Sequence, residues 1–181
     1  AIQNNDRVGL IIFTDDVETY VPPKKGKKHV LRVIRELLFF KPNQHRTNVA
    51  AALDYLNKLH VRRSVVFLVS DFKSEPFESS LRAAKRKHDV IGISVRDPRE
   101  ESLPDVGIVE LEDAETGDEV LLDTSDAETR RLFEKSYREE AADRAATFRA
   151  IGIDTIDVTT AAPYVDPLMR FFRSRAVKLR A

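Results

Sequence analysis

The chain has 181 residues, of which 42% are hydrophobic and 33% are charged, so it is long enough for one globular domain and too apolar for a disordered segment. Thirty basic residues balance thirty acidic ones, which excludes a strong net charge for attracting nucleic acid. The absence of cysteine excludes disulfides, and no apolar run reaches the roughly 18 residues of a membrane span, so we expect a single cytoplasmic domain over residues 1–181.

Short aliphatic runs predict the strands. Four of them have the composition of buried parallel strands, at residues 8–14, 64–70, 89–95 and 153–158. A further segment, 17–21, follows the first run after only two residues and precedes two prolines. That spacing predicts a tight turn and an antiparallel edge strand that ends at the prolines.

Helical patterns alternate with these strands. Apolar residues at helical spacing predict helices around residues 30–38 and 49–56, and Ser74 is expected to cap a helix over about 76–88. The longest helix is predicted to begin at a capping box over 125–128 and to end at Gly152. This alternation predicts a three-layer α/β/α fold with a mostly parallel sheet covered on both faces.

Charge is distributed unevenly along the chain. Residues 97–128 are strongly acidic, and the segments 106–112 and 119–123 within them predict a hairpin inserted into the basic plan, with its turn at Gly117. Residues 24–28 and 170–180 are basic. These segments are either ordinary solvated surface or docking sites for a partner.

Two oxygen-bearing residues are expected at the carboxyl ends of strands, where ligands bind in parallel sheets. Asp71 directly follows the run 64–70, and Thr47 lies in a polar loop just before the helix that begins near Val49. Hydroxyl and carboxylate oxygens suit Mg²⁺. Each residue also has a structural interpretation, because Thr47 or Asn48 could cap a helix and Asp71 could cap the turn that follows it.

A series of segments resembles, in order and spacing, the bacterial "domain of unknown function 58" family. The matching segments are residues 6–14, 22–31, 47–53, 63–72, 88–91, 97–100, 103–105, 112–117 and 171–175. The resemblance spans nearly the whole chain. It implies a von Willebrand factor A-like, Rossmann-like fold with a metal-ion-dependent adhesion site, in which Thr47 and Asp71 correspond to the ligands of the second and third loops.

The resemblance also implies that part of this site is missing. Its first loop should read Asp-x-Ser-x-Ser after a central strand between segments 8–14 and 64–70, and no such sequence is present; the third loop reads Ser70-Asp71-Phe72, where many von Willebrand domains carry Thr-Asp-Gly. We expect a domain without its first strand and first metal loop, with weak or no Mg²⁺ binding. Losing a buried strand costs roughly 10 kcal/mol, so we expect the two flanking strands to pair directly or a second copy to cover their edges in a homodimer.

No enzyme motif stands out. The six glycines form neither a dinucleotide-binding nor a P-loop pattern, and the four histidines lack metal-ligand spacing. The principal hypothesis is a non-catalytic protein–protein interaction module with an incomplete adhesion site, for which the resemblance implies a MoxR-type AAA+ ATPase as partner in protein assembly or maturation. The alternatives are a metal-assisted phosphohydrolase using Asp71 and His45, and a metal-independent charged docking domain. No nucleic acid or membrane partner is expected.

Overall fold

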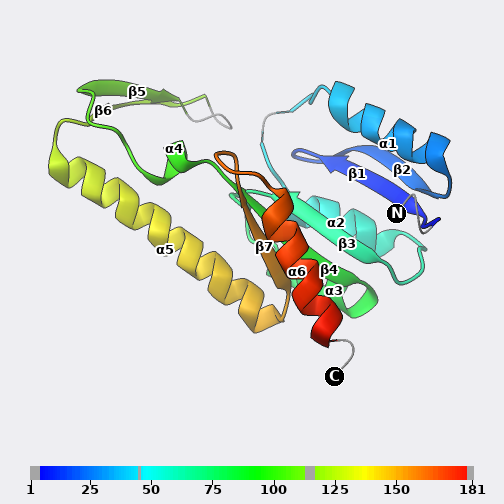
Figure 1. Cartoon of the computed structure of the whole chain (residues 1–181). Helices are drawn as coiled ribbons and strands as arrows, with labels where there is room; N and C mark the ends of the chain where they lie inside the picture. The colour runs from blue at the N-terminus through cyan, green and yellow to red at the C-terminus, as the bar shows by residue number, and fades with distance from the viewer. Residues whose placement is uncertain (1–4, 45, 113–116, 179–181) are drawn as a thin grey trace.

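The computed structural model describes residues 5–44, 46–112 and 117–178. Strands and helices follow one another along the chain as in Figure 1. Their bounds are β1 (Val8–Phe13), β2 (Val17–Lys24), α1 (Lys27–Phe39), α2 (Val49–Lys58), β3 (Val65–Ser70), α3 (Glu78–Lys87), β4 (Asp89–Arg96), α4 (Pro98–Glu101), β5 (Ile108–Glu112), β6 (Glu119–Asp123), α5 (Ala127–Ile151), β7 (Asp154–Thr159) and α6 (Val165–Lys178).

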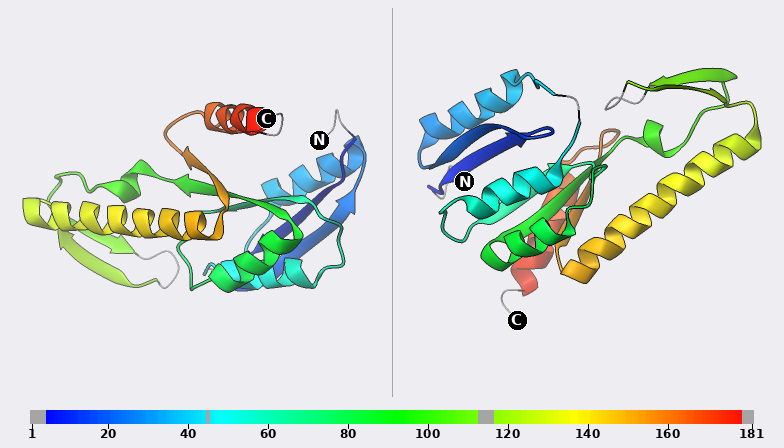
Figure 2. Two further views of the ribbon diagram at one scale, coloured as in Figure 1. Left: turned by 90° about the horizontal axis from the view of Figure 1, so that it is seen from below. Right: turned by 180° about the vertical axis from the view of Figure 1, so that it is seen from behind.

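A parallel sheet with the order β3-β4-β7 lies at the centre of the molecule. Side chains on one of its faces, such as Leu68 and Val90, join a core with residues of helices α2, α3 and α5, among them Leu53, Leu81 and Phe148. Figure 2 shows helix α6 on the opposite face. Helices therefore cover both faces, which confirms the mixed α/β class predicted from alternating strands and helices.

Strands β1 and β2 form a separate antiparallel pair. Within the described residues β1 bonds only to β2 and β3 only to β4, so the first of the two predicted alternatives, direct pairing of these strands, is wrong. The second alternative, coverage of their edges by another copy, stays a prediction. Helix α2 joins the two sheets instead: Leu53 belongs to a core cluster that includes Leu68 of β3, and Ile11 and Phe13 of β1 pack against that cluster. Because one helix holds both strands by side-chain packing, their backbones need not meet.

Several predicted boundaries require correction. Strand β2 continues through both prolines to Lys24, which is compatible with its place at the edge of a two-stranded sheet. Helix α3 begins after Phe77 with no side-chain cap, so Ser74 is not its N-cap. Helix α5 is capped by Asp126, whose carboxylate accepts from the N–H groups of Glu128 and Thr129. Gly152 ends that helix in the left-handed conformation, as predicted.

The predicted acidic hairpin exists as the pair β5–β6. Gly117 has the positive φ expected of a turn residue, whereas residues 113–116 lie outside the described part of the chain. Thr124 closes the base of the hairpin, since its hydroxyl donates to the carbonyl of Gly107 at 2.6 Å and accepts from the N–H of Val106 at 3.1 Å. None of the helices, within the described residues, is long and apolar enough to cross a membrane.

Candidate functional site

Asp71 lies where strand β3 ends, as the sequence predicts. Its carboxylate Oδ1 accepts hydrogen bonds from the hydroxyl of Ser70 at 3.2 Å and from the backbone N–H of Lys73 at 3.2 Å. The turn that follows β3 is thus capped by Asp71 itself. Phe72, between these residues, has a φ of 62° and a buried ring. Asp71 therefore has the structural role predicted as an alternative to metal binding, that of capping the turn after β3.

A group of charged side chains surrounds Asp71, and we call it the charged rim. It consists of Asp71, Lys73, Arg96, Glu100, Glu140 and Arg144. Lys73 comes from the turn after β3, Arg96 from the end of β4, Glu100 from α4, and Glu140 and Arg144 from α5. The rim therefore lies beyond the carboxyl ends of two neighbouring parallel strands, the place where such folds bind ligands.

Ion pairs hold two of the rim's cations, Lys73 and Arg96. Lys73 Nζ lies 2.7 Å from Glu100 Oε2. Burial opposes the charge of Lys73, but the hydrogen bond and charge of Glu100, helped by the charges of Asp71 and Glu140, raise its pKa. Arg96 lies 3.8 Å from Glu101, and its Nε atom is buried without a hydrogen-bond partner. The rim thus brings charges of both signs together near Asp71.

Thr47 belongs to a different part of the structure. It is half-buried in the loop before helix α2, and the adjacent N–H of Asn48 donates to the carbonyl of Thr14 at the end of β1 at 2.8 Å. Glu18 fastens the same loop, because its carboxylate accepts from the hydroxyl of Thr14 at 2.6 Å and from the backbone N–H of Asn43 at 3.0 Å. Asn48, rather than Thr47, caps α2.

Thr47 lies beside the end of β1, because the N–H of the next residue, Asn48, donates to the carbonyl of Thr14, and Asp71 directly follows β3. The arrowheads of β1 and β3 point the same way in Figure 1. They belong to separate sheets, however, and among the described residues no hydrogen bond or ion pair joins the two loops. No group of three acidic or histidine side chains arranged for a metal is found in the described part of the chain. The donor set does not fit a complete Mg²⁺ site, because one carboxylate that already caps a turn and is flanked by Lys73 offers little to a dication.

The space enclosed by the charged rim is small. Its volume of about 10 Å³ holds about one water molecule and no substrate. His45, the proposed acid/base partner of Asp71, lies outside the described residues. Sequence reasoning missed five members of the rim, namely Lys73, Arg96, Glu100, Glu140 and Arg144. Arg96 directly follows the predicted strand 89–95, which was an available signal, whereas Glu100, Glu140 and Arg144 reach the rim only through tertiary packing.

The sequence matches a known protein family over most of its length. Residues 1–143 match the family described as "Protein of unknown function DUF58", and the chain is a member of that family. This confirms the family resemblance found in the sequence.

Relatives come from mycobacteria. Uncharacterized protein Rv1480 of Mycobacterium tuberculosis (strain ATCC 25618 / H37Rv) is 33% identical over 174 residues, which are 94% of this chain and 54% of the relative. Uncharacterized protein MAV169 of Mycobacterium avium is 34% identical over 161 residues, or 87% of this chain and 94% of the relative. The chain thus spans about half the length of Rv1480.

A solved structure shares the fold. The crystal structure of conserved hypothetical protein BatB from Bacteroides thetaiotaomicron superimposes with a TM-score of 0.51 over 96% of this chain and 80% of that chain. Sequence identity is 14%, so the likeness concerns the fold alone. It supports the α/β class and carries no information about a ligand or partner.

Proposed function

We propose that this chain is a non-catalytic protein-interaction module that docks a partner at the charged rim, and that its metal-ion adhesion site is incomplete. The mixed charge of the rim is the observation that carries the proposal. Lys73, Arg96 and Arg144 lie together with Glu100 and Glu140 near Asp71, in a space too small for a substrate. Patterned charges of both signs select a partner with the opposite pattern and fix its orientation.

The same observation favours docking without a metal in this chain. Arginine and lysine side chains near Asp71 compete with a dication for its carboxylate. We therefore propose weak or absent Mg²⁺ binding by residues 1–181, with Thr47 and Asp71 serving as metal ligands only in a complete domain. Isothermal titration calorimetry with MgCl₂ tests this; a tight, stoichiometric heat of binding contradicts it.

The family resemblance implies a MoxR-type AAA+ ATPase as the partner, and we propose such an ATPase as the protein that the rim contacts. The test is a pull-down of the purified ATPase from the same organism by the wild-type chain and by Asp71→Ala and Lys73→Glu variants. We expect each substitution to weaken binding about tenfold. Asp54→Ala on the exposed side of helix α2 removes the same charge as Asp71→Ala outside the rim and is expected to leave binding unchanged.

Salt and chelator separate the possible modes of binding. Docking through charges weakens as ionic strength rises and ignores EDTA, whereas a metal bridge responds to EDTA first. Binding that is lost with EDTA supports the metal-dependent mode instead. Hydrolysis of a generic phosphoester by the wild-type chain that disappears in Asp71→Ala contradicts the non-catalytic assignment and favours the phosphohydrolase alternative.

A further inference from the structure

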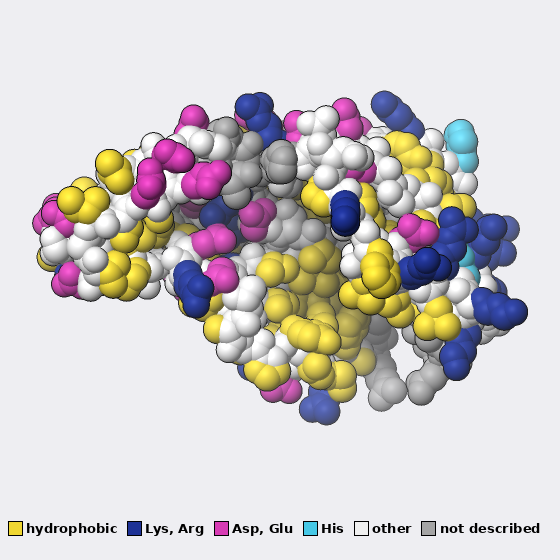
Figure 3. Space-filling view, turned by 90° about the horizontal axis from the view of Figure 1, so that it is seen from above, with side chains coloured by type: hydrophobic (Ala, Val, Ile, Leu, Met, Phe, Trp, Pro, Cys, Tyr) yellow, Lys and Arg dark blue, Asp and Glu magenta, His cyan; other side chains and the backbone are white. Residues whose placement is uncertain are grey.

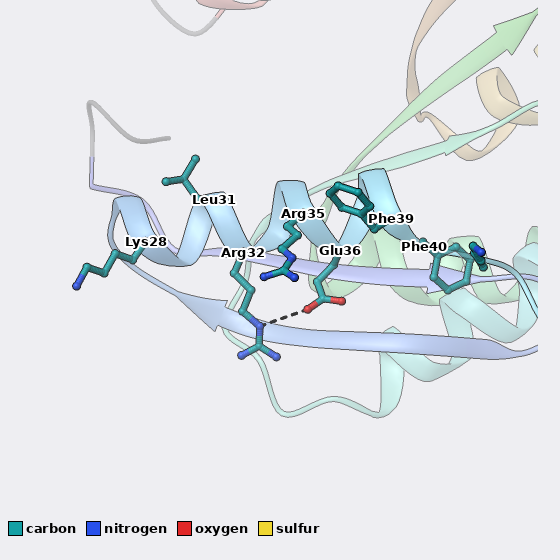
Figure 4. A pocket seen from close by; sticks show the side chains of 8 residues that line it. Lys28, Leu31, Arg32, Arg35, Glu36, Phe39 and Phe40 are labelled. Carbon is teal, nitrogen blue, oxygen red and sulfur yellow. Dashed lines mark ion pairs between the residues drawn. The ribbon is translucent and has the colours of Figure 1, made fainter.

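Helix α1 presents an outer surface with the character of a binding face. Lys28, Arg32, Arg35 and Lys41 line a shallow groove of about 720 Å³ together with Leu31 and Phe39, and we call this surface the basic face. The side chains of Leu31 and Phe39 are 53% and 76% exposed. Figure 4 shows Lys28, Arg32 and Arg35 along the helix, and Arg32 is paired to Glu36 at 3.6 Å.

The combination is unusual for a solvated helix surface. An exposed apolar strip costs solubility unless a partner covers it, and the adjoining cations require that partner to be acidic. Within the described residues no ion pair occupies Lys28, Arg35 or Lys41. The basic face is therefore suited to a partner surface that has apolar side chains interspersed with carboxylates.

The hairpin β5–β6 has that composition. Its strand register places Ile108, Glu110 and Glu112 on one surface with their neighbours Asp123, Leu121 and Glu119. We call this surface the acidic face. Ile108 and Leu121 are 72% and 70% exposed, so this face also displays apolar side chains among its carboxylates. A two-stranded hairpin is marginally stable by itself, and covering one face would stabilise it.

The two faces lie apart within one molecule. Figures 1 and 2 place the hairpin beyond the start of helix α5, while helix α1 lies across the molecule over β1 and β2. On the face seen in Figure 3, acidic side chains are most numerous toward the hairpin end, and lysine and arginine side chains are most numerous toward the opposite end. A chain of zero net charge with separated charges of opposite sign is complementary to a second copy of itself.

We propose that two copies of this chain associate in an antiparallel, two-fold arrangement, with the acidic face of each hairpin on the basic face of the other copy's helix α1. A two-fold axis places each acidic face on the other copy's basic face, so both contacts form together and the assembly closes as a dimer. This contact does not involve the charged rim and does not depend on the function proposed for it.

Charge reversal in trans tests the proposal. One variant, Lys28→Glu with Arg35→Glu, makes the basic face acidic; the other, Glu110→Lys with Glu112→Lys, makes the acidic face basic. Sedimentation velocity and light scattering over a concentration series are expected to show a wild-type dimer that salt weakens, and at least about tenfold weaker association of each variant alone. An equimolar mixture of the two variants is expected to regain the dimer, because each face again meets its opposite charge.

A charge reversal outside both faces serves as the control. Lys135→Glu with Arg138→Glu makes the same charge change on helix α5 and is expected to leave the dimer intact, and far-UV circular dichroism verifies that every variant is folded. A wild-type chain that stays monomeric at all concentrations overturns the proposal, as does a mixture that remains monomeric. Binding of the wild type to phosphatidylserine vesicles that only the α1 variant loses, without self-association, shows instead that the basic face binds lipid.

Discussion

Phe72 combines backbone strain with a buried ring. Its φ of 62° costs an L-residue roughly 1–2 kcal/mol. The centroid of its ring lies 4.9 Å from the ring centroid of Phe148 and 5.9 Å from that of Phe77. Truncation of a buried Phe costs about 3–5 kcal/mol. We expect Phe72→Gly to be about 1 kcal/mol less destabilising than Phe72→Ala, because glycine loses the same packing and relieves the strain.

Urea denaturation of the two variants measures this difference, with Phe77 as the matched control. Phe77 belongs to the same aromatic cluster but has a φ of −127°, so the usual order is expected there, with Phe77→Gly worse than Phe77→Ala. Equal costs for the two Phe72 variants would show that the backbone at this turn is not strained.

The sequence anticipated part of this situation. The tripeptide Ser70-Asp71-Phe72 has phenylalanine where Thr-Asp-Gly has glycine. A left-handed backbone, as found at Phe72, favours glycine at this position. What compensates for the departure could not be predicted, because Phe77 and Phe148 reach Phe72 only in the folded chain. The charged rim was only partly predictable for the same reason. Asp71 was predicted because it follows a strand, whereas Arg144 of α5 comes near it only in the folded chain.

His88 makes stability depend on pH. It ends helix α3, as expected of a helix-end residue, but its side chain is only 2% exposed and its Nδ1 atom has no hydrogen-bond partner. Burial, and to a lesser extent the charges of Lys87 and Arg63, lower its pKa from the ordinary value of 6.5. The unfolded chain therefore binds a proton before the folded chain does, so stability present above pH 6.5 is lost as the pH falls below that value.

Chemical denaturation between pH 5 and pH 8 is the measurement for His88. His88→Gln is expected to flatten the dependence of the unfolding free energy on pH in the range below the ordinary histidine pKa. His60→Gln, at an exposed position, serves as the control and is expected to retain the slope. An unchanged slope in His88→Gln would mean that this imidazole titrates normally in the folded protein.

At the scale of elements, the acidic hairpin depends on its base. Thr124 is fully buried, and its hydroxyl satisfies the N–H of Val106 while donating to the carbonyl of Gly107. Thr124→Val keeps the shape but leaves the N–H of Val106 without a partner, at a cost of about 1–3 kcal/mol. We expect faster amide exchange in β5 and β6, measured by hydrogen–deuterium exchange mass spectrometry, while Thr124→Ser stays close to wild type.

Element positions were more predictable than their ends. Aliphatic runs identified β1, β3, β4 and β7 to within one or two residues, because short runs rich in valine and isoleucine are typical of strands. Caps were less certain, since Ser125 and Asp126 are both good N-cap residues and only the hydrogen bonds of Asp126 distinguish them. Helix α6 was not predicted; its Arg175 pairs with Asp89 and Asp154, so part of the basic C-terminus is structural.

At the scale of the whole molecule, the arrangement of the sheets was the least predictable feature. Strand pairing joins segments that are distant in sequence, and local patterns do not determine which edges meet. The sequence predicted one sheet containing β1 and β3, whereas the structure places these strands in two separate sheets that are connected through α2. Exposed Val65, Phe67 and Val69 on β3 mark the surface that a continuous, fully covered sheet would bury.

This arrangement predicts unequal stability in the two parts of the molecule. Within the described residues, the part made of β1, β2 and α1 is joined to the parallel sheet by the apolar cluster to which α2 contributes Leu53, and not by a shared hydrogen-bond ladder. Local opening is easiest where buried contacts are few. Native-state hydrogen exchange is therefore expected to show β1 and β2 opening at a lower free energy than β3 and β4.

Substitutions on α2 test whether this helix is the connection. Leu53→Ala removes a buried side chain of this cluster, and we expect it to cost about 2–5 kcal/mol. We also expect it to lower the protection of β1 and β2 more than that of β3 and β4, because the parallel sheet keeps its contacts with α3 and α5. Asp54→Ala, one residue along on the exposed side of the same helix, controls for effects on helix formation. An equal loss of protection in β1–β2 and in β3–β4 would show that the two sheets unfold as one cooperative unit, although no backbone hydrogen bonds join β1 to β3 within the described residues.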